Sequence, residues 1–295
     1  MSIVTGKLFH AGGASFASVC YTPQKSAGRW SWQTYWLAQA AVCWLLLPII
    51  VAAVTIPHLK EVLMEAPVTA MYTSFILGAA YGIGGTAFGL AIRSVGFSLT
   101  YAISVGISCV LGTLLPPLVH GELASVFGKA GAGWLISGIA LGAAGIAVCG
   151  WAGRLKEKDM AGNDDETGFS LAKGLPLCIL AGLLSAVYGF ALDQGQPIAD
   201  VAAKYGGGHF QGNVIYIFAN AGAFLSTAIY CIYLHVKQKT VGEYIRVKSE
   251  GKPLRLQLNY LLAFITGVLW YAQFFFYGLG HTRMGVYKFS SWAVH

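Results

Sequence analysis

Long uncharged, apolar runs alternate with short polar segments along this chain. Residues 35–56, YWLAQAAVCWLLLPIIVAAVTI, carry no charged side chain. The hydrocarbon core of a bilayer is about 30 Å thick and takes roughly 20 apolar helical residues to cross. Because the runs are continuous and do not alternate with polar residues, they predict helices and not barrel strands. Eight helices are predicted, at about 3–22, 35–56, 68–91, 95–119, 132–151, 173–193, 211–235 and 258–279.

The composition agrees with this pattern. Of the 295 residues, 56% are hydrophobic and only 11% are charged, whereas a soluble domain carries about 25% charged residues. The sequence therefore predicts an all-α polytopic membrane protein. The net charge of +7 also suits a protein that binds nucleic acid. Cationic loops of a membrane protein explain it better, so we expect the lipid bilayer as partner and no nucleic acid.

The distribution of Lys and Arg predicts the orientation. Thirteen of the 19 fall in the first, third, fifth and seventh loops between the predicted helices, and six lie elsewhere. Cytoplasmic loops carry the excess of positive charge. We therefore expect these odd-numbered loops, including the hydrophilic segment 152–172, in the cytoplasm and the N-terminus outside.

Small residues follow a packing pattern in the predicted helix 68–91. Gly78, Gly82, Gly85 and Gly89 form two successive G-x-x-x-G pairs, a spacing that lets helix backbones approach closely in lipid. These pairs permit a dimer without requiring one, and the sequence leaves the oligomeric state open. The six cysteines lie within or beside apolar segments without any C-x-x-C pair. We therefore expect small buried residues and no metal site.

Aromatic residues gather at 30–36 and again at 270–277. An aromatic belt at the membrane interface explains the first cluster. The second cluster surrounds Gln273, and an amide flanked by rings such as Trp270 and Tyr271 suits a sugar, which needs both hydrogen bonds and a stacking surface. Ordinary helix packing explains the second cluster as well, and both interpretations stay open.

Ionisable residues inside the predicted helices are few. His10 lies in the middle of the first helix, where a histidine loads and releases a proton near neutral pH or stays buried and neutral. Arg93 and Asp193 lie near helix ends, where a side chain reaches water. His281 and Arg283 follow the last helix. The sequence shows no cluster of nucleophile, base or metal ligands that would indicate an enzyme.

Five segments carry a resemblance through nearly the whole chain in matching order: YTPQKSAGRWSWQTYW, YGIGGTAFGLAIRSVGFSL, ISCVLGTLLPPLVHGEL, WAGRLKEKDM and LWYAQFFFYGLGHTR. They resemble the L-rhamnose–proton symporter family of the drug/metabolite transporter superfamily. The resemblance implies a carrier in the bacterial inner membrane that imports L-rhamnose with a proton as coupling ion and without a cofactor. It also implies two five-helix halves of inverted topology and an external N-terminus.

The resemblance divides the chain into a first five-helix half at 1–155, a cytoplasmic loop at 156–172 and a second half at 173–295. Because the family continues for two more helices, we expect the second half to be incomplete, with three helices. Where the family tends to a neutral amide, this chain carries Asp193, which either alters coupling or faces water.

Matching positions of the family pattern supply the candidate site residues. We expect Trp270, Tyr271 and Gln273 to bind the sugar, and His10 and His281 to couple the proton. Structural or orienting roles are expected for the four glycines named above and for two arginines, Arg93 and Arg283.

Two other functions remain open. The chain could carry another sugar or small metabolite, although the absence of an acid from the first helix argues against a cationic drug. It could also be a membrane protein that transports nothing, such as a sensor or a partner subunit.

Overall fold

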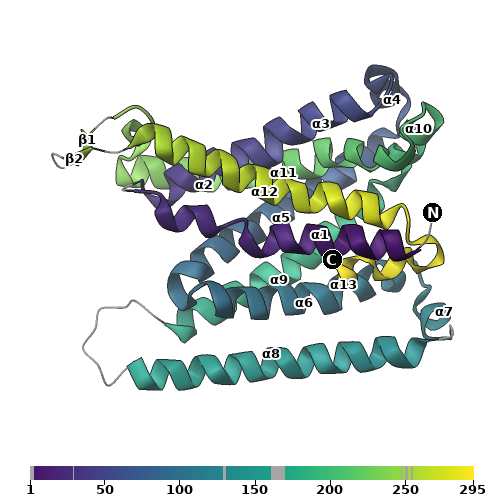
Figure 1. Ribbon diagram of the computed structural model, residues 1–295, viewed down its shortest axis with the longest axis horizontal. Helices are drawn as coiled ribbons and strands as arrows, with labels where there is room; N and C mark the ends of the chain where they lie inside the picture. Colours follow the sequence, from purple (N-terminus) through teal and green to yellow (C-terminus); the bar gives the residue numbers. More distant parts are fainter. Residues whose placement is uncertain are drawn as a thin grey trace. The chain divides into compact units, whose positions relative to one another are not determined.

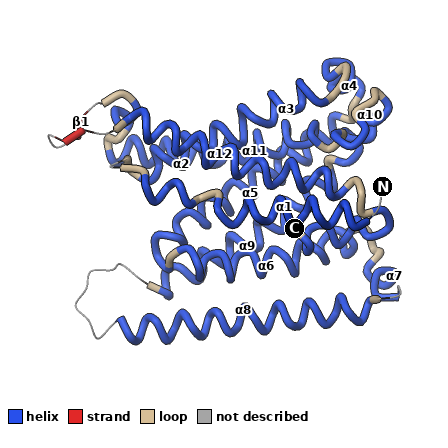
Figure 2. Tube along the Cα trace, in the orientation of Figure 1, coloured by secondary structure: helices blue, strands red, loops and turns tan. Residues whose placement is uncertain are grey.

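The computed structural model describes residues 3–28, 30–128, 131–160, 170–246, 248–249, 252–253 and 255–295, and these are almost entirely helical (Figures 1 and 2). The elements are α1 (Ile3–Val19), η1 (Thr22–Ser26), α2 (Trp32–Ala40), η2 (Ala41–Leu46), α3 (Leu47–Thr55), α4 (Leu59–Glu65), α5 (Val68–Val95), α6 (Phe97–Val119), α7 (Leu123–Gly128), α8 (Ala132–Met160), α9 (Leu171–Gln194), α10 (Gln196–Lys204), η3 (Gly208–Phe210), α11 (Asn213–Gln238), η4 (Val241–Tyr244), β1 (Lys248–Ser249), β2 (Lys252–Pro253), α12 (Leu256–His281), η5 (Gly285–Ser290) and α13 (Ser291–Val294). The strands β1 and β2 pair antiparallel.

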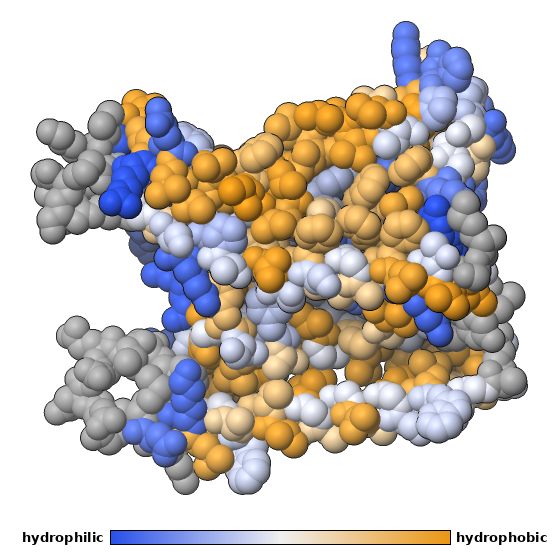
Figure 3. All heavy atoms as spheres, in the orientation of Figure 1, coloured by the Kyte–Doolittle hydropathy of each residue, from blue (hydrophilic) through white to orange (hydrophobic). Residues whose placement is uncertain are grey.

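Within the described residues, seven helical segments are long and apolar enough to cross a membrane. They correspond to seven of the eight predicted spans, so the prediction of an all-α polytopic protein is confirmed. The predicted span 3–22 is the exception: α1 ends at Val19 after 17 residues. At 1.5 Å per residue the 17 residues rise about 26 Å, at the short end of the range that crosses a bilayer core, and residues 1–2 before them lie outside the described part. In Figure 3, hydrophobic residues cover the visible side of α3 and α12, as lipid-facing helices require.

The loop predicted at 152–172 is shorter than expected. The helix α8 continues to Met160 and α9 begins at Leu171, while residues 161–169 lie outside the described part. Apolar patterning places the end of a span at the first charges, but helical hydrogen bonds continue through Arg154, Lys156 and Lys158 because these residues are good helix formers.

Close packing divides the chain into two compact units. Unit 1 comprises Met1–Ala79 and Gln194–His295, and unit 2 comprises Ala80–Asp193. Each unit therefore draws on both predicted halves, 1–155 and 173–295. This grouping by contact does not test the predicted repeat, which stays a prediction.

In unit 1, glycines bring pairs of antiparallel helices together. A Cβ added to Gly6 of α1 would lie 3.1 Å from the carbonyl oxygen of Gly280 in α12, and one added to Gly13 would lie 2.9 Å from that of Gln273. Figure 1 shows α1 and α12 side by side. The predicted packing position Gly78 meets α11, where an added Cβ would overlap the carbonyl of Ala219. Both crossings follow the rule that small residues let helix backbones approach in lipid.

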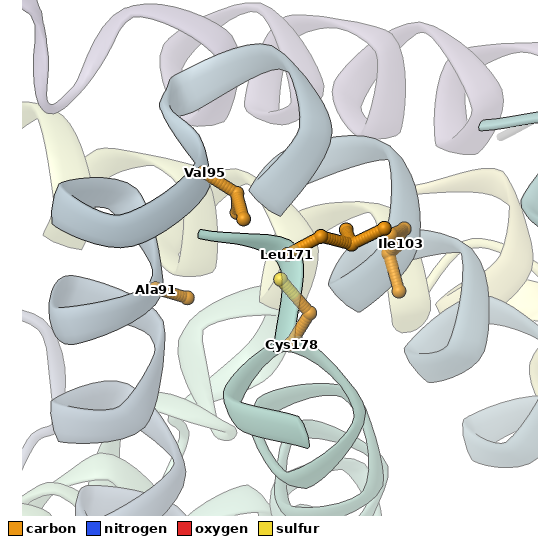
Figure 4. Packing of buried hydrophobic residues seen from close by; sticks show 5 residues of the cluster. All are labelled: Ala91, Val95, Ile103, Leu171 and Cys178. Carbon is orange, nitrogen blue, oxygen red and sulfur yellow. The ribbon is translucent and has the colours of Figure 1, made fainter. Parts of the chain in front are cut away.

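Unit 2 has its own apolar core. Ala91 and Val95 of α5, Ile103 of α6, and Leu171 and Cys178 of α9 form a buried cluster (Figure 4). Glycines again set the distance between helices: a Cβ on Gly182 of α9 would lie 2.8 Å from the carbonyl oxygen of Ser104 in α6.

The other glycines of the predicted pattern, Gly82, Gly85 and Gly89, are buried. The close approach next along α5 is at Gly84, outside the predicted spacing, where an added Cβ would lie 2.6 Å from Cβ of Leu184.

Candidate functional site

His10 is completely buried in unit 1, with 0% of its surface exposed. Its ring lies edge-on to Tyr277 of α12 at 5.4 Å between centroids, and 5.7 Å from the ring of His295. A Cβ on Gly280 would lie only 2.8 Å from His10 Nε2, so the glycine makes room for the imidazole. Among the described residues, neither ring nitrogen of His10 finds a hydrogen-bond partner. A buried histidine without partners is unusual, because an unmet buried polar group costs about 1–3 kcal/mol.

Tyr277 joins the two histidines proposed for proton coupling. The His281 ring, also on α12, stacks on Tyr277 at 5.6 Å between centroids, so Tyr277 contacts both His10 and His281. Arg283, which follows α12, lies with its guanidinium carbon 4.8 Å from the centroid of Phe9. Its Nη1 donates a hydrogen bond of 2.6 Å to the carbonyl of Leu279. Arg283 therefore ties the end of α12 to α1, next to His10.

The three residues predicted to bind sugar are buried but do not share one side of α12. Trp270 packs edge-on to Trp44 of η2 at 5.4 Å. Tyr271 faces α11, edge-on to Tyr216 at 6.1 Å. At 100° per residue, Gln273 lies about 160° around the helix from Tyr271, and the Gln273 backbone meets α1 at Gly13. The structure therefore brings Trp270 and Tyr271 toward the same group of helices and directs Gln273 elsewhere.

The aromatic cluster at 30–36 was predicted to be a belt at the membrane interface, and for three of its residues, which face the protein interior, that prediction is wrong. Trp32, Tyr35 and Trp36 are all buried in unit 1. The Trp36 ring stacks on Tyr21 at 5.3 Å and on Trp32 at 5.1 Å. Aromatic residues near a helix end suit the membrane interface and a protein core equally well, and only the contacts separate the two.

Gln39 of α2 was not singled out by the sequence. Only 1% of its surface is exposed, and neither its amide nitrogen nor its amide oxygen has a hydrogen-bond partner among the described residues. The backbone carbonyl oxygen of Gln39 would lie 3.0 Å from a Cβ added to Gly267 of α12. The hydroxyl of Tyr271, with 3% of the residue exposed, is likewise without a partner in the described part of the chain. We call His10, Gln39 and Tyr271 the unpaired set.

A second polar group in unit 1 lies where α2 begins and α11 ends. Its members come from 31–34 and 235–244, and we call it the Glu243 network: Ser31, Gln33, Thr34, His235, Gln238, Thr240, Glu243 and Tyr244. Glu243 Oε2 accepts hydrogen bonds from the Ser31 amide at 2.8 Å, the Ser31 hydroxyl at 2.8 Å and the Thr34 hydroxyl at 2.5 Å. A carboxylate in this position caps the positive N-terminus of α2.

The remaining members of the Glu243 network are equally well bonded. Gln33 Nε2 donates to Gln238 at 3.0 Å and to Thr240 at 2.8 Å. The two ring nitrogens of His235 lie 2.8 Å from the Thr240 hydroxyl and 3.0 Å from the Tyr244 hydroxyl. Burial, with smaller contributions from nearby anions, raises the pKa of Tyr244 above its ordinary value, so the phenol stays a neutral hydrogen-bonding group.

The predicted positions Arg93 and Asp193 belong to unit 2. Arg93 is exposed near the end of α5. In unit 2, Asp193 Oδ2 lies 2.7 Å from His120 Nε2. This hydrogen bond and the charge of Asp193 raise the pKa of His120. Within the described residues, no group of three or more His, Cys, Asp or Glu side chains is placed to hold a metal ion.

Comparison with known proteins identifies the family. The family model of the L-rhamnose-proton symport protein (RhaT) matches residues 1–295. The chain belongs to this family. An L-rhamnose-proton symporter of Cronobacter sakazakii is 34% identical over 299 residues, which cover 100% of this chain and 85% of the relative. The proteins of that name from Yersinia pestis and Yersinia pseudotuberculosis are 31% identical, with the same coverage. No solved structure matches the chain.

Membership of the RhaT family confirms the resemblance drawn from the sequence. The family consists of symport proteins and not of enzymes, which agrees with the absence of clustered catalytic residues from the sequence pattern. Together with the seven spans, it makes the chain a multi-pass membrane protein. The roles of the individual site residues, the division into halves and the direction of the N-terminus stay predictions.

Proposed function

We propose that this protein imports L-rhamnose together with a proton across the bacterial inner membrane, with its N-terminus in the periplasm. The match of the RhaT family model to the whole chain carries the proposal, and relatives at 31–34% identity bear the same name. The proton is the coupling ion, and no cofactor is required. In the proposed arrangement, 1–155 and 173–295 are inverted halves that alternately open the site to either side of the membrane.

His10 supports the coupling step of this proposal. An ionisable side chain inside a membrane protein is costly and is usually part of an ion or proton pathway. Because neither ring nitrogen has a hydrogen-bond partner among the described residues, His10 offers an acceptor for a proton and a donor for a ligand. A proton taken from the periplasm favours sugar binding, and the higher pH of the cytoplasm releases it. On α12, the Tyr277 ring contacts His10, and the His281 ring stacks on Tyr277.

Uptake of labelled L-rhamnose tests the proposal. The chain is expressed in cells that lack their own rhamnose carrier, and its presence in the membrane is measured in each sample. We expect uptake that a protonophore abolishes and that excess unlabelled L-rhamnose competes away. Competition by other sugars then ranks the substrates. If the chain reaches the membrane, takes up no labelled L-rhamnose and takes up another labelled metabolite, the protein carries that metabolite. Uptake that is insensitive to the protonophore would refute proton coupling.

The proposed orientation has its own test. Single cysteines are placed in the segment 161–169 and, in a second variant, at Glu61 in the short helix α4, which lies between α3 and α5 in the chain. A membrane-impermeant thiol reagent added to intact cells is expected to label the second position and to spare the first. The opposite pattern would overturn the periplasmic N-terminus.

A further inference from the structure

We infer that Gln39 is a specificity-determining residue of the transport site and that its amide, together with the Tyr271 hydroxyl, forms hydrogen bonds to hydroxyl groups of the sugar. This inference rests on the proposed function and adds a residue on α2 to it. It starts from burial: Gln39 and Tyr271 are 1% and 3% exposed, and their side-chain polar atoms have no partner among the described residues.

The backbones of α2 and α12 meet beside Gln39. A single Cβ added to Gly267 of α12 would lie 3.0 Å from the backbone carbonyl oxygen of Gln39 and 2.6 Å from Cβ of Val42. Tyr271 follows Gly267 by four residues and therefore lies on nearly the same side of α12, about 6 Å further along the helix. Gln39 and Tyr271 thus belong to the same stretch of the α2–α12 crossing.

The surroundings supply the other requirement of a sugar site, an aromatic wall. Trp270 neighbours Tyr271 on α12 and packs on Trp44 and Phe274 at centroid distances of 5.4 Å and 4.8 Å. The apolar face of a sugar ring stacks on such rings while its hydroxyls bond to amides. The helix also changes here: residues 41–46 are π-helical, and π segments are rare and concentrate at functional sites.

A purely structural role explains Gln39 poorly. Gln33, six residues earlier on the same helix, is equally buried and donates two hydrogen bonds. A glutamine that only filled space at position 39 would leave two polar atoms unmet, and an apolar side chain of the same shape would serve better. An amide that bonds a transported ligand is necessarily unmet whenever the ligand is absent.

The test compares Gln39→Met with Gln33→Met, because methionine keeps the length of glutamine and removes its amide. We expect Gln39→Met to raise the KM for L-rhamnose uptake roughly 10- to 100-fold, the effect of two lost hydrogen bonds, with an unchanged or higher melting temperature. Gln33→Met is expected to lower the melting temperature and to keep the KM. Tyr271→Phe, which removes one oxygen and leaves the packing intact, should raise the KM roughly fivefold.

Monodeoxy derivatives of L-rhamnose add a readout that a structural role would not move. One of these derivatives lacks the hydroxyl that Gln39 bonds. The wild type should take up this derivative less well than L-rhamnose, whereas Gln39→Met should take up both about equally. If Gln39→Met and Tyr271→Phe both keep the wild-type KM, the inference is wrong although the function stands. If Gln39→Met fails to reach the membrane, the KM of Tyr271→Phe and the uptake of the deoxy sugars by the wild type test the inference instead. If the wild type takes up no L-rhamnose, the proposed function fails and this inference with it.

Discussion

The helix α2 begins in one kind of environment and continues into another. At its start, Gln33 and the neighbouring Ser31 and Thr34 belong to the Glu243 network, in which the buried polar groups hold one another. Two turns later, Gln39 is buried, and its amide has no hydrogen-bond partner among the described residues. The same contrast separates two buried histidines: both nitrogens of His235 are bonded, whereas neither nitrogen of His10 has a partner in the described part of the chain. In the proposed function, the paired polar groups hold the helices together, whereas Gln39 bonds the sugar and His10 takes the proton.

The largest expected effect comes from His10. Replacement of His10 by Ala should abolish proton-driven accumulation of L-rhamnose and should spare the exchange of labelled for unlabelled sugar, because exchange needs no net proton movement. The measurement is uptake with an inward proton gradient beside counterflow in preloaded vesicles. His235→Ala is the matched control: it should lower the melting temperature and keep coupled uptake. Coupled accumulation in the His10→Ala protein would remove His10 from the mechanism.

The next effect concerns the space around His10. Gly280→Ala puts a methyl group 2.8 Å from His10 Nε2, and overpacking of this kind costs about 1–3 kcal/mol. We expect a melting temperature lower by about 2–12 °C, since 1 kcal/mol corresponds to about 2–4 °C in a protein of this size, together with reduced uptake. Gly12→Ala on α1 is the control, because its Cβ would meet Phe276 at an ordinary 3.7 Å. Equal effects of the two substitutions would show that the crossing of α1 and α12 tolerates no side chain anywhere.

A smaller loss is expected at the cap of α2. Glu243→Ala leaves the Ser31 amide and two hydroxyls without their acceptor, which should lower stability by about 1–3 kcal/mol. Because the Glu243 network is structural in this account, the KM for L-rhamnose should stay at the wild-type value. Thermal unfolding and uptake kinetics measure the two quantities. Glu61→Gln, at an exposed position, should change stability by less than about 0.5 kcal/mol. A KM that rises while the melting temperature stays constant would place Glu243 in the transport site.

The smallest effect belongs to unit 2, where His120 contacts Asp193. Asp193 raises the pKa of His120 above its ordinary 6.5, so the stabilisation is complete below that value and disappears as pH rises through the raised pKa. The wild type should therefore melt above Asp193→Asn at acidic pH and not at alkaline pH. Exposed ion pairs contribute only about 0–1 kcal/mol, so the difference is small. A difference that does not vary with pH would assign the effect of Asp193 to something other than the ion pair.

The sequence predicted the helices well because lipid leaves little choice: a long apolar run without charge must satisfy its own backbone. It also identified Gly78 as a packing position. His10, which the sequence singled out, is buried, and its role in proton coupling stays a prediction. The opposite directions of Tyr271 and Gln273 follow from helical geometry alone, although their closeness in sequence suggested one site.

Other features could not be predicted from local pattern. The hydrogen bonds that distinguish Gln33 from Gln39 are made to Gln238 and Thr240, which lie 205 and 207 residues from Gln33 in the chain. The cap that Glu243 provides for α2 is equally remote. The burial of Trp36 is accompanied by stacking on Tyr21 and Trp32. For Gln33 and for the cap of α2, the deciding information is a contact between distant segments.

The most direct test of the central claim is proton movement caused by L-rhamnose itself. Purified protein is reconstituted into vesicles with a pH-sensitive dye in the weakly buffered external solution, and L-rhamnose is added without any imposed gradient. The account predicts that the external solution becomes more alkaline with the wild type and with His235→Ala, and that it stays unchanged with His10→Ala. Entry of L-rhamnose without a change of external pH in the wild type, or an undiminished change with His10→Ala, would contradict it.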